Sequence, residues 1–193
     1  METAYAENKI FENRDFTKHC LRENEFENCE FKGCNFANTD LSDVKFFDCT
    51  FSTCNLSLAK LTKTTFRISK FRDCKMLGLH FEHCNLLGFE CSFHGCNLTH
   101  SSFFGLKIKK TLFSNTLLQE CDFAGADLSD AVFEKCDLSG TSFENTILER
   151  ADFRTAYNYS IDPNLNMLKK ARFGLSGIPG LLNKYNTEID QDS

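Results

Sequence analysis

The sequence predicts an all-β solenoid, a chain of short strands wound into stacked coils. A large apolar residue returns at every fifth position over most of the chain, and a small residue stands two positions before most of them. Seventeen of the 21 phenylalanines occupy these repeat centres. The pattern is most regular over 121–153, where the centres are Phe123, Leu128, Phe133, Leu138, Phe143, Leu148 and Phe153.

A period of five fits neither an α-helix nor a straight strand. The centre of each repeat and the residue two before it point to the same side of a strand. An odd period would turn the next repeat outward unless the chain bends between repeats. Short sides joined by corners keep every centre inside, and such coils bury a core only by stacking on one another.

Repeats are expected over residues 11–156, after an N-terminal lead at 1–10 that shows no period. The small-residue slots of the first repeats hold Lys9, Arg14, His19 and Asn24 instead. The terminal coils of a solenoid have one face in water and are often atypical. Residues 9–24 are therefore predicted to form an N-terminal cap coil.

The repeats run without a break from Phe11 to Leu86, and the next centre is due at position 91. It arrives two residues late at Phe93, after which the pattern holds to Phe153. A two-residue insertion near 89–90 explains the delay. We expect it to form a small bulge at a corner rather than a domain boundary.

After the last repeat, residues 157–185 are predicted to form a helical cap. Asp162 and Pro163 have the residue types of a helix N-cap and first position, and they predict a short helix over 164–173.

A second short helical piece is predicted after Pro179, carrying Leu181, Leu182 and Tyr185. The open end of a solenoid is an unpaired strand edge, which these segments would cover. The polar tail at 186–193 is expected to be flexible.

The repeat unit consists of a small residue, a polar residue, leucine or phenylalanine, and two further polar residues. It resembles the unit of the pentapeptide-repeat proteins, and residues 126–130, ADLSD, are close to the ideal unit of that family. The resemblance covers residues 11–156. It implies a right-handed quadrilateral β-helix with four repeats per coil and about seven coils, a rod about 35 Å long at a strand spacing of about 4.8 Å.

Eleven cysteines suggest a metal or redox site, but their positions favour packing. Only Cys20 falls outside the small slots, which hold Cys29, Cys34, Cys49, Cys54, Cys74, Cys84, Cys91, Cys96, Cys121 and Cys136. A buried cysteine behaves as a small apolar side chain. The C-x-x-C spacing typical of zinc sites does not occur. No metal site is therefore predicted.

The chain is expected to lie in the cytoplasm, with no membrane attachment. Its first residues lack the basic lead and apolar core of a signal peptide. No apolar run approaches the length that crosses a bilayer. Many cysteines without an export signal favour a reducing compartment.

No catalytic or cofactor-binding residue is predicted, and the chain is not expected to be an enzyme. The histidines have no carboxylate and nucleophile recurring beside them, and the glycines form no phosphate-binding loop. A β-helix filled with phenylalanine and leucine also has no cleft of its own.

One surface departs from the polar character of the outward positions. Phe47, Ile68 and Leu87 fall on one face when 20 residues are counted per coil, with Phe89 at its edge. Leu58 and Leu77 lie on the neighbouring face. A contiguous apolar strip would mark a binding surface. The alternative is that outward positions simply tolerate scattered apolar residues.

The net charge of −5 conceals a division of the chain into a basic middle and acidic ends. Residues 51–110 carry nine basic and three acidic groups, whereas residues 111–193 carry seven basic and thirteen acidic groups. Lys107, Lys109 and Lys110 fall on the face of the apolar strip. Direct binding of nucleic acid is not expected, because the total charge is negative and no stacking aromatics are interleaved with the basic residues.

Two functions remain open. The first is a non-enzymatic protein–protein interaction module with an unknown partner, acting through Phe47, Ile68, Leu87 and Phe89. The second is a DNA-mimicking modulator or protector of type II topoisomerase, as in the quinolone-resistance branch of the family that the chain resembles. In that branch the rod resembles B-DNA in width and negative charge, and C-terminal elements often pair two chains.

The similarity to that branch is partial. The acidic C-terminal coils fit, whereas the basic middle and the lack of a long projecting loop do not. No functional residue is therefore carried over from it. A homodimer through the C-terminal region also remains open.

Overall fold

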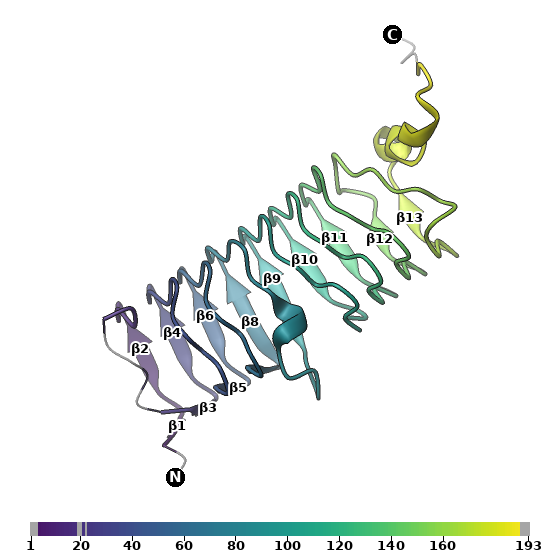
Figure 1. The fold of residues 1–193 in the computed structure, drawn as a ribbon. Coiled ribbons are helices and arrows are strands. Elements are labelled where there is room, and N and C mark those ends of the chain that lie inside the picture. Colours follow the sequence, from purple (N-terminus) through teal and green to yellow (C-terminus); the bar gives the residue numbers. More distant parts are fainter. Residues whose placement is uncertain (1–3, 19–20, 22, 190–193) are drawn as a thin grey trace.

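The computed structural model describes residues 4–18, 21 and 23–189 and shows a rod of stacked coils (Figure 1). The strands are β1 (Tyr5–Glu7), β2 (Ile10–Glu12), β3 (Glu25–Glu27), β4 (Glu30–Lys32), β5 (Lys45–Phe47), β6 (Thr50–Ser52), β7 (Thr65–Arg67), β8 (Ser69–Arg72), β9 (Cys91–His94), β10 (Leu112–Ser114), β11 (Val132–Glu134), β12 (Asp152–Phe153) and β13 (Arg172–Phe173). Three short 3₁₀ helices accompany them: η1 (Phe81–His83), η2 (Leu175–Leu181) and η3 (Asn183–Tyr185). In this part of the chain, no helix is long and apolar enough to cross a membrane.

The strands form two parallel sheets on adjoining sides of the rod. A nine-stranded sheet has the order β13-β12-β11-β10-β9-β8-β6-β4-β2, and a four-stranded sheet has the order β1-β3-β5-β7. Successive strands pair with a shift of 20 residues, as in Phe11↔Phe31 and Phe113↔Phe133. Each coil therefore holds four five-residue sides, which confirms the expected β-helix. The nine strands of the larger sheet stand one turn apart, so the chain makes about eight turns rather than the seven expected.

Most corners have a left-handed backbone at the second residue after the repeat centre. Asn28 (φ 49°) and Asp48 (φ 45°) occupy two such corners, and their amides donate to the carbonyls of Phe47 and Arg67 in the next coil. Asparagine, aspartate and glycine adopt this conformation most readily. The polar end of each repeat therefore follows from the backbone geometry of the corner.

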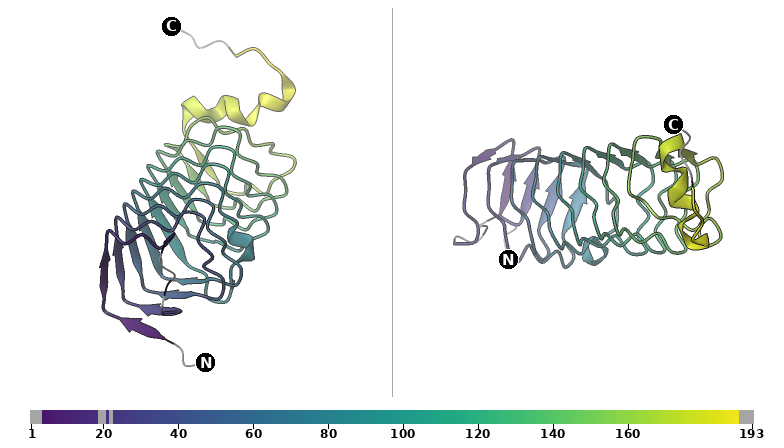
Figure 2. Two further views of the ribbon diagram at one scale, coloured as in Figure 1. Left: turned by 60° about the vertical axis from the view of Figure 1, so that its left-hand side comes forward. Right: turned by 90° about the horizontal axis from the view of Figure 1, so that it is seen from above.

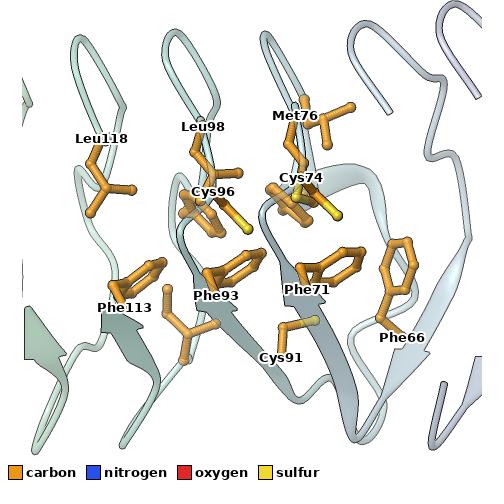
Figure 3. Packing of buried hydrophobic residues seen from close by; sticks show 14 of the residues in the cluster. Phe66, Phe71, Cys74, Met76, Cys91, Phe93, Cys96, Leu98, Phe113 and Leu118 are labelled. Carbon is orange, nitrogen blue, oxygen red and sulfur yellow. The ribbon is translucent and has the colours of Figure 1, made fainter. Parts of the chain in front are cut away.

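The core is built from columns of stacked side chains. Nine phenylalanines lie behind the larger sheet, one in each coil, and neighbouring rings stack with centroids 4.6–5.4 Å apart. Figure 3 shows Phe71, Phe93 and Phe113 in this column. A second column joins Phe81, Phe103, Phe123 and Phe143, and its rings meet those of the first edge-on. Such offset and edge-to-face contacts add to the energy of simple burial.

The ten cysteines of the small slots are buried and free. Six of the thiols donate to main-chain carbonyls of the preceding coil, as from Cys54 to Phe31 (3.3 Å) and from Cys74 to Phe51 (3.4 Å). They act as packing groups, as predicted from their positions. Cys20 and His19, named in the sequence predictions, lie outside the described residues.

The N-terminal boundary was predicted too late. Strand β1 (Tyr5–Glu7) already pairs with β3, and Ala6 is buried at a repeat centre within the expected lead at 1–10. Alanine is too small to continue a pattern of large apolar centres. In the expected cap coil, Phe11, Phe16 and Leu21 are only half-buried, in keeping with a terminal coil.

The C-terminal boundary was predicted too early. The helix expected over 164–173 does not form, because this segment adds another coil. Met167 bridges Ile147, and β13 pairs with β12. Asp162 accepts a hydrogen bond from the amide of Asn164 (2.8 Å), which closes a turn and not a helix.

The cap over the last coil consists of the 3₁₀ helices η2 and η3 (Figure 2). Buried Tyr159 packs beneath it, and a Cβ atom added to Gly177 or Gly180 would collide with that tyrosine. Residues 186–189 have no regular structure, and the rest of the predicted flexible tail lies outside the described residues.

Candidate functional site at the two-residue insertion

The insertion interrupts one wall of the rod. Strands β8 and β9 pair with a shift of 22 residues, as in Phe71↔Phe93, and the smaller sheet ends at β7. The chain rejoins the wall at Glu90, whose amide donates to the carbonyl of Phe66 (3.1 Å) and whose carbonyl accepts from the amide of Ser69 (2.9 Å). Cys91 and Phe93 then continue the core (Figure 3). Residues 86–89 thus form the bulge, slightly earlier in the chain than the predicted position near 89–90.

Within the bulge, the expected repeat centre is wrong. Leu86 lies on the surface with 49% of its area exposed. Phe89 is partly buried instead and packs against the core, with its ring 6.2 Å from that of Phe81 in an edge-on arrangement. The extra two residues allow the chain to bring the larger side chain inward. Phe89 is therefore more a core residue than an edge of the apolar strip.

The remaining residues of the predicted strip divide into two columns. Phe47 pairs with Arg67 in the sheet, and the Arg67 guanidinium carbon lies 4.6 Å from the centre of the Phe47 ring. Leu87 is 85% exposed. Ile68 stands in the adjoining column, at a left-handed corner. Arg67 therefore covers part of the strip, and Phe47 is half-buried.

A groove of about 470 Å³ opens beside Ile68, between the bulge and the two coils that flank it. Ile68, Phe89 and Leu112 line its apolar part, and Ile68 and Leu112 are 45% and 43% exposed. Leu112 was missed by the sequence predictions, although it occupies an outward position of its repeat next to Phe113. The same departure from polar outward positions that singled out Ile68 could have found it.

The polar part of the groove is basic. Its charged lining consists of Lys70, Lys107, Lys109, Lys110 and Glu90. Lys70 pairs with Asp48 (3.3 Å) and Lys109 pairs with Asp127 (3.0 Å), both beyond the groove. Lys107 and Lys110 make no ion pair with any described residue. Two ammonium groups are thus available to a ligand.

Chemistry-bearing side chains do not converge elsewhere in the described chain. His80 contacts Glu82 (2.9 Å), and its ring stacks on that of His83. The neighbouring thiol of Cys84 is buried, and burial raises its pKa to about 12, so it does not act as a nucleophile with them. Residues 4–18, 21 and 23–189 contain no group of three or more histidine, cysteine or acidic side chains placed to hold a metal ion. The interior is filled with side chains, so the groove can bind but offers no catalytic set.

The last coil and the 3₁₀ cap carry a second apolar surface. Its exposed side chains are Tyr157, Leu165, Met167, Leu175, Ile178, Leu182 and Tyr185. Leu175 is 90% exposed. This end of the rod is therefore more apolar than its sides.

Comparison with known proteins identifies the repeat and the fold. A family model described as pentapeptide repeat region matches residues 24–103, 44–123 and 78–153. The structure of full-length QnrB1, described as a plasmid-mediated fluoroquinolone resistance protein, is 16% identical, covers 95% of this chain and 100% of its own, and gives a TM-score of 0.55.

Two further structures are similar. A trypsin-treated form of QnrB1 is 22% identical over 98% of this chain and 94% of its own, with a TM-score of 0.50. HetL, a pentapeptide-repeat protein from the cyanobacterium Nostoc, is 15% identical over 88% and 87%, with a TM-score of 0.32. No curated protein sequence matches significantly. At these identities the likeness concerns the fold.

Proposed function

The chain belongs to the pentapeptide-repeat family, and we propose that it is a non-enzymatic module that binds another protein through the surface at the two-residue insertion. The observation that supports this most directly is the conformation of Ile68. It has φ 55° at a left-handed corner and remains 45% exposed.

A β-branched residue is poorly suited to this corner. The left-handed conformation costs about 1–2 kcal/mol for an ordinary L-residue, and most other corners hold asparagine, aspartate, glycine or an unbranched side chain. A residue kept in a strained conformation without being buried is typical of functional surfaces. The groove lies beside it, and exposed Leu87 directly precedes Gly88 of the groove lining, so this surface offers apolar side chains to a partner.

The test begins with purified native partners. Proteins captured from a lysate of the native cells would be identified by mass spectrometry, purified and measured by calorimetry. We expect a binary complex that weakens at least tenfold in the variant Ile68→Asn with Leu87→Ser. The matched control is Leu58→Asn, because Leu58 is also exposed at a left-handed corner (φ 58°) but lies on the neighbouring face. If the wild type, the double variant and the Leu58 control bind the partner equally, this surface is not the binding site.

A second candidate function is the modulation or protection of a type II topoisomerase by DNA mimicry. The excess of acidic groups after residue 110 supports it. Many of these carboxylates are occupied locally, however: Asp130 pairs with Arg150 (2.7 Å) and Asp152 with Arg154 (2.8 Å). A gyrase supercoiling assay with and without a fluoroquinolone tests this function. If micromolar protein changes neither the rate of supercoiling nor the sensitivity of gyrase to the drug, this second function is excluded.

We also propose that two chains pair through the C-terminal surface and that the protein works in the cytoplasm. Exposed Leu175 and Leu182 support the pairing, and ten free buried thiols suit a reducing compartment. Sedimentation equilibrium should show a dimer that dissociates in Leu175→Ser with Leu182→Ser. A wild-type monomer at tens of micromolar would contradict the pairing.

A further inference from the structure

We propose that the groove at the insertion binds a short acidic peptide segment with aliphatic side chains, supplied by a partner protein. This inference rests on the proposed function and names the chemistry of the partner at that site. Three features of the groove carry it: its charge, its exposed aliphatic side chains and its length along the rod.

Charge complementarity selects an acidic ligand. Four lysines and one glutamate line the groove, although the whole chain carries −5. Lys107 and Lys110 are exposed and pair with no described carboxylate. Both lie on the segment 107–112, one on each side of buried Ile108. Carboxylates of a ligand would therefore meet ammonium groups that the protein leaves without partners, which favours association.

The apolar lining selects aliphatic groups between those carboxylates. Ile68 and Leu112 lie among the lysines, and the edge of Phe89 lies between the two coils that carry them. Burying the exposed part of these aliphatic side chains against a ligand would stabilise a complex, because apolar surface would leave water. A purely anionic ligand would leave these side chains in water.

The length of the basic zone favours a peptide over nucleic acid. The groove spans three successive coils, or about 10 Å at a spacing of about 4.8 Å, which matches three or four extended residues. On the C-terminal side of the groove the coils are acidic: residues 113–132 carry four acidic groups and no basic one. A DNA duplex has one charge per about 1.7 Å and would meet these acidic coils at once. The groove also lacks an exposed aromatic platform on which bases could stack.

The test uses the full chain and a synthetic peptide that carries fluorescein at its N-terminus, fluoresceinyl-Gly-Glu-Leu-Glu-Asp-Leu-Glu-Gly-amide, and measures binding by fluorescence anisotropy. We expect saturable binding that weakens at least fivefold in Lys107→Gln with Lys110→Gln. The matched control is Lys169→Gln with Lys170→Gln, because Lys170 occupies the same kind of left-handed corner (φ 61°) as Lys110 (φ 60°) outside the groove. The control variant should bind the peptide as tightly as the wild-type protein does. A peptide with serine in place of both leucines should bind the wild-type protein more weakly.

Several outcomes would overturn the inference: no saturable binding, equal loss in both lysine pairs, or a short DNA duplex that binds more tightly than the peptide with the same dependence on Lys107 and Lys110. A change of oligomeric state in the Lys107 and Lys110 variant would show that a second copy covers the groove, and would overturn the inference.

The proposed function can fail independently of this inference. If a native complex depends on Ile68 and Leu87 but not on these lysines, that function stands and the acidic ligand is wrong. If the peptide binds with the expected dependence on these lysines but no native complex depends on this surface, the groove binds acidic peptides and the proposed function is wrong.

Discussion

The ring of Phe133 stacks on that of Phe153 with centroids 4.6 Å apart and an angle of 10° between their planes. On the other side, Phe133 stacks on Phe113 at 5.2 Å, and its side chain is fully buried. Phe133→Ala should therefore lower the free energy of unfolding by about 3–5 kcal/mol, as for other buried phenylalanine truncations. Urea denaturation followed by circular dichroism measures it.

The control for this prediction is Phe104→Ala. Phe104 is 57% exposed and lies outside the columns, so its loss should change stability by about 0.5 kcal/mol or less. Similar effects at the two positions would mean that the column does not hold the rod together.

Phe89 and Leu86 exchange the roles that the repeat pattern predicts for them. Phe89→Ala should destabilise the protein by about 1–3 kcal/mol, because its partly buried ring contacts Phe81. Leu86→Ala should be nearly neutral, because that side chain is half-exposed. Thermal unfolding of the two variants compares them directly. A larger loss at Leu86 would show that the repeat runs on to position 86 as the pattern implies.

The regular part of the fold could be predicted from sequence because nearly every repeat must meet the same two structural requirements. Most corners need a residue that adopts a left-handed backbone, and each five-residue side needs one large side chain that points into the core. The period of the repeat and the register of the strands therefore follow from the residue types. The ends and the bulge do not obey this rule. Ala6 is a centre that is too small to notice, and the last coil lacks large centres at Asn158 and Pro163 before it resumes at Leu168.

The groove could be predicted only in part. Counting residues placed Ile68 and the lysines of 107–110 on one side of the rod, which the structure bears out. Counting could not show that Phe89 turns inward or that Arg67 covers Phe47, because both depend on local packing. The groove itself arises from the displaced backbone of the bulge, and no repeat pattern encodes its shape.

The buried thiols should resist alkylation in the native protein. Burial raises the pKa of Cys121 to about 12, and the thiolate is the reactive form. In N-ethylmaleimide at neutral pH, the ten described cysteines should react only as fast as the rod unfolds, and all should react in guanidinium chloride. Mass spectrometry of the digested protein reads each site. Rapid native labelling of Cys121 would contradict its place in the core.

Asp152 should make stability depend on pH in the acid range. Its carboxylate accepts from Arg154 (2.8 Å) and also pairs with Arg172 (3.1 Å). The hydrogen bond from Arg154, with further help from Arg172, lowers the pKa of Asp152 below its ordinary value of 3.8. These ion pairs therefore make their full contribution to the free energy of unfolding above about pH 4. The contribution is lost as the pH falls through the lowered pKa of Asp152.

Asp152→Asn should cost about 1 kcal/mol at pH 7, since both arginines are more than half exposed and screened by solvent. The difference from wild type should shrink below pH 4, as measured by urea denaturation at several pH values. Arg154→Gln with Arg172→Gln should remove the same pH dependence while keeping the carboxylate. A difference that stays constant down to pH 2 would rule out these ion pairs as its source.

Ile68 should be a site where stability and binding oppose each other. Its left-handed conformation is unfavourable for a β-branched side chain, whereas asparagine adopts it readily. Ile68→Asn should therefore raise the free energy of unfolding by about 1 kcal/mol while it weakens binding at the groove. Ile68→Val keeps the branched Cβ and should give no such gain. Urea denaturation of the three proteins, beside peptide anisotropy on the same samples, separates strain from lost contact. If Ile68→Asn is less stable than wild type, the isoleucine is retained for packing, and its strain says nothing about a partner.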